Sequence, residues 1–375
     1  MDESHDIWRE SIRSFIEKEI TPNIESWEDA GRIPRELYPK AAAAGLLGLG
    51  YPEKFGGSGT ETDVFHSIIG SEELARVGAG GLVAALMIHG IGLPPIMALG
   101  SNEMKAEVAP QILSGEKQIS LGITEPSGGS DVAKLKTKAV RDGNGWRVSG
   151  SKSYITGGMT SKWLTTAVRT GEDGMKGISL MLIDLESEGV SRTELPKMGW
   201  LCSDTAIIYF DDVFVPAENM IGQENQGFYG IMANFNSERL GMAAQATAYA
   251  RVCIEDAAEW AQQRETFGKR LADHQVIRHK LASMAQRVWS TTALLDNCAW
   301  RVSKGESPIA ELSMLKVQAT ETMEFCAREA MQMLGGAGFI RGHRIERIYR
   351  EVRVMAIGGG SEEIMRDLTA RQMGF

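Results

Sequence analysis

The first third of the chain carries apolar residues at the spacing of amphipathic helices. Trp8, Ile12 and Phe15 follow this period among charged residues, and a Thr-Pro pair then ends it. Similar segments, bounded by glycines or by a capping serine, predict further helices. The predicted helical segments are 6–19, 35–44, 62–77, an apolar stretch at 80–99, and 101–115. We therefore expect residues 1–116 to form an N-terminal helical domain.

Short β-type runs replace the helical period after residue 117. They are separated by turn sequences such as Asp142-Gly143-Asn144-Gly145, which favour tight connections between strands. The predicted strands lie at 118–123, 146–149, 163–168, 178–183 and 206–210. This spacing predicts a compact all-β middle domain at 117–222.

The helical period returns after Gly222. A long helix is expected at 228–262, and the next carries a single apolar stripe. That stripe consists of Ile277, Leu281, Met284, Val288 and Leu295. Ser307 is expected to cap a third helix that ends at Gly335–Gly336, and a shorter one follows Ser361. Residues 223–375 are therefore predicted to form a C-terminal four-helix bundle, in a chain that is mainly α with a β middle domain.

Composition and charge restrict the possible partners. The 375 residues are 43% apolar and 24% charged, which is typical of a soluble multidomain protein. The net charge of −9 disfavours nucleic acid as a partner. The four cysteines form no CxxC pair, so we predict no metal site and reduced thiols.

The N-terminus lacks the basic and apolar regions of a signal peptide. No apolar run reaches the roughly 18 residues that a membrane span needs. We therefore expect a cytoplasmic protein that binds no membrane. The alternative is the mitochondrial matrix, if a transit peptide has been removed.

Glu238 is the first candidate for chemistry. It stands in Asn236-Ser237-Glu238-Arg239-Leu240, near the expected start of the 228–262 helix and before a run of small residues. The alanines of that run, at 243, 244, 246, 248 and 250, could let a flat or extended ligand approach closely. A glutamate at a helix start is also a favourable partner of the helix dipole, so the residue alone leaves a base and a structural role open.

Three further motifs could bind a phosphate-bearing ligand. The loop 121–131 contains Gly128 and Gly129, which allow backbone N–H groups to face an anion, but any glycine-rich turn looks similar. Arg264 has the forked donor group that suits a pyrophosphate, and a solvated loop is the alternative. The sequence 332–336 is at least a glycine helix cap.

Together with Ser151-Lys152-Ser153-Tyr154-Ile155-Thr156 and Gly358-Gly359-Gly360-Ser361, these motifs resemble the acyl-CoA dehydrogenase family of flavoenzymes over nearly the whole chain. The resemblance implies the acyl-CoA dehydrogenase fold, with FAD between the β domain and the C-terminal bundle. It also implies oxidation of an acyl-CoA thioester to its 2,3-enoyl form, with electrons passed to electron-transferring flavoprotein.

The resemblance assigns FAD contacts to two groups of residues. It puts the Tyr154 ring beside the isoalloxazine, where the family often has Trp, and the Thr156 hydroxyl near flavin N5. Contacts within one subunit are implied for Leu121, Ile123, Thr124, Gly129, Ser130, Tyr154, Ile155, Thr156, Ser361 and Glu363. Contacts to the FAD of a neighbouring subunit are implied for Arg264, Gln275, Gln332, Gly335 and Gly336, so a homotetramer or dimer is expected.

The family carries its catalytic glutamate at one of two positions. The medium- and short-chain branches have it at the position of Gly359, and the isovaleryl-CoA and long-chain branches have it at that of Glu238. The resemblance therefore makes Glu238 the base that removes the α-proton, while a hydride passes from Cβ to flavin N5. The Gly359 N–H is expected to hold the thioester oxygen. The implied substrate contacts are Ser130, Tyr229, Asn236, Ser237, Arg239, Gly359 and Gly360.

Other functions on this scaffold stay open from the sequence. An oxidase would pass electrons to oxygen, and a desulfinase acting on a sulfinated acyl-CoA needs no base, which Glu238 disfavours. DNA-associated flavin proteins of this superfamily carry an added basic region, which this acidic chain lacks. A helical scaffold without flavin is the remaining alternative. The acyl group and the pathway are not specified by the sequence, although Gly359 leaves space that suits a long or branched chain.

Overall fold

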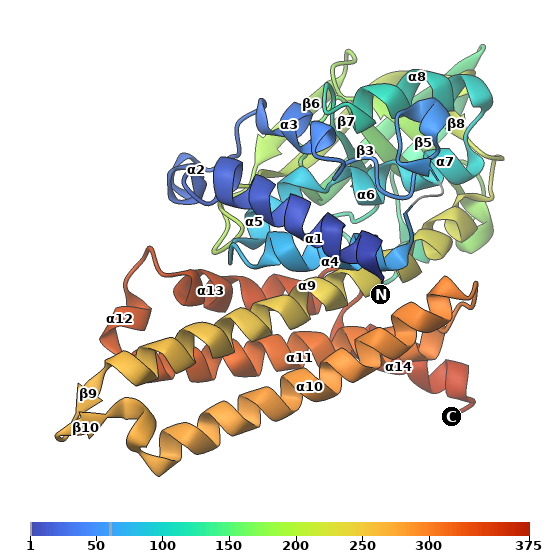
Figure 1. The fold of residues 1–375 in the computed structure, drawn as a ribbon. Coiled ribbons are helices and arrows are strands. Elements are labelled where there is room, and N and C mark those ends of the chain that lie inside the picture. Colours follow the sequence, from blue (N-terminus) through green and yellow to red (C-terminus); the bar gives the residue numbers. More distant parts are fainter. Residues whose placement is uncertain (1, 60–61) are drawn as a thin grey trace.

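The computed structural model describes residues 2–59 and 62–375, apart from the side chains of residues 233, 234 and 236. Helices form the first and last parts of the chain, and a β-sheet forms the middle part, so the predicted α–β–α order is confirmed. Figure 1 shows the long C-terminal helices in one layer, with the N-terminal helices between them and much of the sheet.

Short helices build the N-terminal part. They are α1 (Glu3–Phe15), continued by a π-helical turn (Ile16–Ile20), α2 (Ile24–Ala30), α3 (Leu37–Ala43), α4 (Val64–Ala75), α5 (Gly80–Leu86), α6 (His89–Gly92), α7 (Pro94–Leu99) and α8 (Asn102–Leu113). Ser101 caps α8 as predicted, with its hydroxyl accepting the Met104 N–H at 3.1 Å. Among the described residues no single helix is long and apolar enough to cross a membrane, although the bent pair Gly80–Leu86 and His89–Leu99 passes by length and composition.

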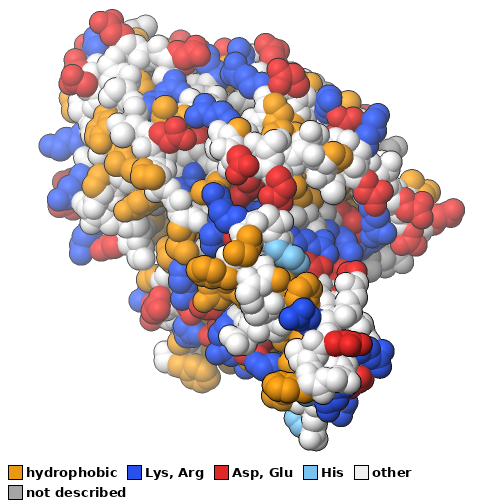
Figure 2. All heavy atoms as spheres, turned by 90° about the vertical axis from the view of Figure 1, so that its left-hand side faces the viewer, with side chains coloured by type: hydrophobic (Ala, Val, Ile, Leu, Met, Phe, Trp, Pro, Cys, Tyr) orange, Lys and Arg blue, Asp and Glu red, His pale blue; other side chains and the backbone are white. Residues whose placement is uncertain are grey.

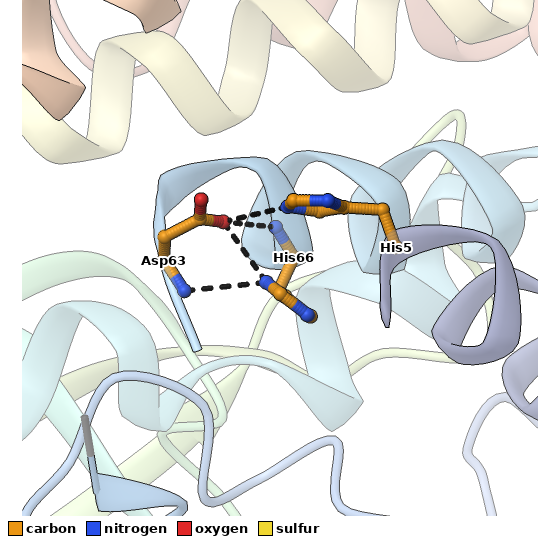
Figure 3. A group of neighbouring side chains, drawn as sticks. All are labelled: His5, Asp63 and His66. Atoms are coloured by element: carbon orange, nitrogen blue, oxygen red, sulfur yellow. Dashed lines mark hydrogen bonds and ion pairs between the residues drawn. The ribbon is translucent and has the colours of Figure 1, made fainter. Parts of the chain in front are cut away.

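Two linked helix caps join α1 to α4, and Figure 3 shows the cluster of His5, Asp63 and His66 at their junction. The Asp2 N–H donates to His5 Nδ1 at 3.0 Å, and the Asp63 N–H donates to His66 Nδ1 at 3.2 Å. His5 Nε2 lies 3.1 Å from Asp63 Oδ1, which also accepts the Phe65 N–H at 2.9 Å. His5, Asp63 and His66 are close enough to hold a metal ion. However, the Nδ1 lone pairs and Asp63 Oδ1 already satisfy the helix caps, so the cluster is explained as a structural link.

A single sheet forms the middle part. Its strands are β1 (Ile119–Gly122), β2 (Lys138–Asp142), β3 (Gly145–Thr156), β4 (Trp163–Arg169), β5 (Ile178–Asp184), β6 (Val190–Glu194), β7 (Thr205–Pro216) and β8 (Met220–Ile221). The order is β6-β7-β3-β2-β4-β5-β8, and β1 pairs in parallel with β4. The sequence did not predict β2 and β6, because β2 buries only Ala139 and β6 buries no residue fully.

The C-terminal part consists of three long helices, α9 (Gly227–Gln263), α10 (Gln275–Ser303) and α11 (Ile309–Leu334), that pack side by side, and of shorter ones that follow them. The shorter ones are α12 (Gly336–Phe339), α13 (Arg344–Ile357) and α14 (Glu362–Met373), and the hairpin β9 (Glu265–Thr266) and β10 (Lys269–Arg270) lies between α9 and α10. The predicted stripe of α10 is confirmed, since Ile277, Met284, Val288 and Leu295 are buried. The prediction of Ser307 as N-cap is wrong by one residue, because α11 begins at Ile309 and Pro308 occupies the cap position.

The alanine run of α9 does not form a ligand surface. Ala243, Ala244, Ala246 and Ala250 are all fully buried in the largest apolar cluster of the C-terminal helices. Helices α4 and α11 pack against α9 there. The small side chains let these helices approach closely, so the prediction of an exposed face for a flat ligand is wrong.

Glu351 ties the three parts of the chain together. Its carboxylate lies in α13 and accepts the Gly80 N–H at 2.7 Å and the Trp200 N–H at 2.8 Å. Gly80 begins α5, and Trp200 lies in the connection between β6 and β7. One buried side chain of the C-terminal helices thus fixes them against the N-terminal helices and the sheet.

Candidate functional site

Glu238 lies inside α9 and not at its start. It is about three turns from Gly227, the first residue of the helix. The helix dipole acts on groups within the first turn, so it does not explain a carboxylate at this position. Interaction with the helix dipole, the structural role that the sequence left open for Glu238, is therefore excluded.

The Glu238 carboxylate lies beside Gly359. Its Oε1 lies 3.6 Å from the point that a Cβ at residue 359 would occupy. The two positions at which the resemblance allows a catalytic glutamate therefore border the same small volume. Met242, one turn further along α9, also reaches it, with its Sδ only 2.6 Å from that Cβ point. The expectation that Gly359 leaves open space is wrong beside its Cα, because Met242 fills it.

The environment of Glu238 moves its pKa toward neutral pH. Its Oε2 is inaccessible to solvent and has no hydrogen-bond partner in the part of the chain that the structure describes. Burial raises the pKa of Glu238 to about 7, against the opposing charges of Arg239 and Lys316. A carboxylate that is half ionised near neutrality is well suited to take a proton in catalysis.

Lys316 belongs to this site, although the sequence analysis did not single it out. It lies in α11, is fully buried, and its ammonium donates to Ala356 O at 3.1 Å and Gly360 O at 2.8 Å. Its spacing in the sequence could have indicated that Lys316 is buried. Leu312 and Thr320, one helical turn away on either side, are both core residues. A lysine on the buried stripe of a helix needs a special partner.

The other substrate-side candidates on α9 differ in exposure. Arg239 is buried, with its guanidinium 5.7 Å from the centre of the Phe235 ring. Tyr229 is 64% exposed, and Ser237 is also exposed. The Asn236 side chain lies outside the described residues. Arg239 is thus the candidate that shares the interior with Glu238, and Tyr229 and Ser237 face outward.

A second group of candidates gathers where β1 and β3 end. The Ser153 N–H donates to Thr124 O at 2.8 Å, and the Ser120 hydroxyl donates to Thr156 O at 2.7 Å. These two hydrogen bonds join the segments 120–124 and 153–156, which lie far apart in sequence. Leu121, Thr124, Tyr154 and Thr156 thereby come to one region, and Ile155 is buried beneath it.

Tyr154 has an unusual backbone conformation in that region. Its φ is +60°, which is strained for a residue with a side chain, and its ring is 70% exposed. Strain of this kind is retained where surrounding contacts hold it, often at a ligand site. An exposed aromatic face held in this way is ready to cover a flat ring system.

The loop after β1 is fixed by a buried ion pair. Lys152 Nζ lies 2.8 Å from Glu125 Oε1, and the same carboxylate accepts the N–H groups of Lys136 and Thr137. Burial lowers the pKa of Lys152 to about 8, and the Glu125 charge opposes the shift. The pair holds the loop so that Gly128, Gly129 and Ser130 stay exposed at its tip.

The remaining candidates lie in two further places. Ser361 caps α14 and accepts the Ile364 N–H at 3.5 Å, and Glu363 stands in the first turn of that helix. The others are exposed at the far end of the bundle, where β9, β10 and α12 lie on the left of Figure 1. They are Arg264, Gln275, Gln332, Gly335 and Gly336. Arg264 is about 39 Å from Glu238 along α9.

Comparison with known families assigns the chain. The N-terminal domain of acyl-CoA dehydrogenases matches residues 2–116, the middle domain 120–213 and the C-terminal domain 225–374. The chain belongs to the acyl-CoA dehydrogenase family. It is accordingly an oxidoreductase of a family that depends on FAD.

Individual acyl-CoA dehydrogenases match over the full length. A probable acyl-CoA dehydrogenase from Mycobacterium abscessus has a TM-score of 0.97 and 44% identity over 100% of both chains. The long-chain specific acyl-CoA dehydrogenase of Rattus norvegicus mitochondria is 36% identical over 98% of this chain and 86% of its own.

Two further matches name a cofactor and a partner. A glutaryl-CoA dehydrogenase from Mycobacterium smegmatis, solved in complex with FADH2, has a TM-score of 0.92 and 25% identity over 100% of this chain and 95% of its own. The subunit CarC of a caffeyl-CoA reductase–Etf complex from Acetobacterium woodii is 34% identical over 97% of this chain and 96% of its own.

The residues of this acyl-CoA dehydrogenase fit the flavin that its family uses. Tyr154 offers an exposed side chain on a strained backbone, and a Cβ at Gly128 would meet no atom within 4 Å, which leaves room for a ligand beside the loop. The Gly128 N–H itself donates to Glu125 O at 3.0 Å, so the expectation that it faces an anion is wrong. Gly335 and Gly336 are equally open at the other end of the bundle. Thr124 and Thr156 add hydroxyls beside Tyr154.

Proposed function

We propose that this protein oxidises an acyl-CoA thioester to the 2,3-enoyl-CoA, with Glu238 as the catalytic base. The observation that carries the proposal is the 3.6 Å between Glu238 Oε1 and the Cβ point of Gly359. The raised pKa of Glu238 adds the required basicity near neutral pH. Because residue 359 is a glycine, the carboxylate beside this position is that of Glu238.

In the proposed reaction the side chains of this protein have separate tasks. Glu238 takes the proton from the carbon next to the thioester carbonyl, and the Gly359 N–H donates to the thioester oxygen. Among the described residues that N–H donates to no protein acceptor, so it is available for a ligand. Bound FAD supplies the acceptor for the hydride from the β-carbon. Exclusion of water by the acyl chain strengthens both interactions.

We assign the flavin ring to the ends of β1 and β3, and the thioester to the region between α9 and the glycine turn, which is the segment 358–360 that links α13 to α14. With FAD bound, Tyr154 would cover one face of the ring system, and Thr156 would offer its hydroxyl as a donor to the flavin. Arg239 is assigned to the pantetheine side of the substrate. Ser130, at the exposed tip of the loop after β1, is assigned to both ligands.

The candidates at the far end of the bundle are assigned to the FAD of a second subunit. Arg264 and Glu238 are about 39 Å apart along α9, so we assign Arg264 to an FAD other than the one at the ends of β1 and β3 in its own subunit. Exposed Phe267, Phe339 and Ile340 accompany Arg264 there. Figure 2, which faces this end, has hydrophobic side chains among Lys and Arg. We therefore propose a homo-oligomer, as the family resemblance implies.

We further propose electron-transferring flavoprotein as the electron acceptor. The proposal rests on the family and on the Etf complex named for the relative from Acetobacterium woodii. A long acyl chain is the first candidate substrate, because the rat relative is named for long chains and carries its similarity over nearly all of this chain.

Anaerobic bleaching of the bound flavin tests the function. The FAD-loaded protein is mixed with straight-chain and 3-methyl-branched acyl-CoAs of increasing length, and flavin absorbance is followed. We expect rapid bleaching with at least one chain class, and transfer to electron-transferring flavoprotein faster than peroxide formation in air. A flavin that stays oxidised with every acyl-CoA would contradict the proposal, and fast peroxide formation would identify an oxidase.

A further inference from the structure

Lys316 is a fully buried ammonium in the middle of the C-terminal helices. It lies in α11, which packs against α9, α13 and α14. An ammonium that leaves water without compensation is costly, so a lysine here requires specific acceptors. The acceptors of Lys316 are the carbonyls of Ala356 and Gly360, which flank Gly359 between α13 and α14.

The Lys316 ammonium holds both ends of the glycine turn. It donates to Ala356 O at 3.1 Å, in the last turn of α13, and to Gly360 O at 2.8 Å, just before α14 begins. Gly358 and Gly359 lie between these two carbonyls. The Gly359 φ of +66° makes this turn sharp, and the C-terminal carbonyls of α13 favour a positive charge.

Charged groups from three helices face Lys316. Glu238 and Arg239 come from α9, Arg353 from α13, and Glu362 from α14. Burial lowers the pKa of Lys316 to about 8, while Glu362 and Glu238 oppose the shift. Lys316 is thus mostly charged at neutral pH, and its charge in turn lowers the pKa of Glu238 against the effect of burial.

We propose that Lys316 is a positioning residue of this enzyme: it fixes the turn that presents the Gly359 N–H to the thioester, and its charge helps to keep Glu238 ionised. The proposal rests on the proposed function for its catalytic consequence. Lys316 transfers no proton and touches no reacting atom. It acts through the two groups that do, Gly359 and Glu238.

The geometry explains why one residue serves both tasks. Because the ammonium has three N–H donors, two can hold Ala356 O and Gly360 O while its charge acts over a longer range on the Glu238 carboxylate. Methionine would fill similar volume without donors or charge. Removal of Lys316 should therefore loosen the turn and weaken the ionised base together.

The test compares Lys316→Met with Thr320→Val, both in FAD-loaded protein. Thr320 lies one turn further along α11 and is buried, and within the described part of the chain its hydroxyl bonds only to carbonyls of its own helix, Lys316 O and Val317 O. Two measurements need no turnover: amide exchange in 354–366, and titration of the Glu238 carboxyl by its infrared band, which is identified by its loss in Glu238→Gln. The third is the pH dependence of bleaching by acyl-CoA.

For Lys316→Met we expect about tenfold faster exchange in 354–366 and an upward shift of the Glu238 titration by about one pH unit or more. The limiting bleaching rate should fall at least about tenfold, with a smaller change in the acyl-CoA concentration for half-maximal rate, and its rising pH limb should shift upward. Thr320→Val should keep the wild-type exchange, titration and pH profile. A folded Lys316→Met with wild-type exchange and titration would overturn the proposal.

If Lys316→Met does not yield folded protein, Lys316→Gln takes its place, because a neutral amide retains a donor. We then expect the upward shift of the Glu238 titration with a smaller increase in exchange, and an unshifted titration would overturn the proposal. Wild-type protein that is never bleached by acyl-CoA would reject the proposed function alone. The exchange and infrared measurements would still test what Lys316 does to the turn and to Glu238.

Discussion

Glu238 Oε1 lies 3.6 Å from the point at which a side chain at Gly359 would begin. Residues 121 positions apart in the chain therefore border one small volume between α9 and the turn that links α13 to α14. A base on the helix and a base on the turn are alternative solutions to the same geometric problem. In this chain the carboxylate is on the helix, and in the proposed reaction the turn contributes a backbone N–H.

The pH dependence of flavin reduction should report Glu238. Its pKa is raised to about 7 by burial, and only the ionised form takes a proton. We expect the limiting bleaching rate to rise about tenfold per pH unit below about pH 7 and to level off above it. Stopped-flow bleaching from pH 5.5 to 7.5 measures this. A rate that is constant over that range would exclude Glu238 as the titrating base.

The same shift predicts a pH-dependent stability. Between the unfolded value of 4.5 and about 7, the folded protein holds a proton that the unfolded chain has lost, so stability falls as pH rises through this window. The full shift corresponds to about 3 kcal/mol, and partial exposure of the side chain reduces it to about 2 kcal/mol. Thermal unfolding should show Glu238→Gln gaining more over wild type at pH 8 than at pH 5. An equal difference at both pH values would contradict the burial of this carboxylate.

Gly359→Ala should be more damaging than an alanine at an ordinary turn glycine. Its φ is +66°, and the new Cβ would lie 2.6 Å from Met242 Sδ. Gly305 is the matched control, with φ +80° and no atom within 4 Å of its Cβ point. We expect Gly305→Ala to cost about 1 kcal/mol and Gly359→Ala about 2–4 kcal/mol, measured by denaturant unfolding. The double variant Gly359→Ala with Met242→Ala should recover the part of the stability loss that comes from the clash with Met242.

Breaking the Lys152–Glu125 pair should weaken flavin binding. In Lys152→Met the buried Glu125 carboxylate loses its cation, which costs about 3–5 kcal/mol in buried pairs. Because that carboxylate holds the loop after β1, FAD should dissociate more readily, as measured by fluorescence of released flavin. The double variant Lys152→Met with Glu125→Gln should recover part of both losses. Unchanged stability and FAD retention in the single variant would reject this role.

Long periodic segments could be predicted from the sequence, and short polar ones could not. The stripe through Ile277, Met284 and Leu295 specified α10, because an apolar face of this length has few alternatives to a buried helix. Strand β2 was missed because only Ala139 faces the core. The alanine run of α9 was misinterpreted, since small side chains suit close packing of protein helices as well as a ligand.

The candidate site was only partly accessible from the sequence. The resemblance identified Glu238 and Gly359 as alternatives, but their closeness depends on the positive φ at 359 and on the position of α13 beside α9. Met242 contacts this position because it lies one helical turn from Glu238. Lys316 contacts the turn because α11 brings its ammonium to Gly360 O. Contacts of this kind depend on tertiary packing, which a residue pattern does not encode.

The central claim is tested most directly by anaerobic stopped-flow bleaching of FAD-loaded Glu238→Gln with the best acyl-CoA of the panel. Glu255→Gln is the matched control, because Glu255 lies on the same helix and forms an exposed ion pair with Arg76 at 3.1 Å. We predict that Glu238→Gln keeps its yellow FAD and loses about 10²- to 10⁴-fold in bleaching rate, while Glu255→Gln reacts as wild type. Undiminished bleaching by Glu238→Gln would contradict the account.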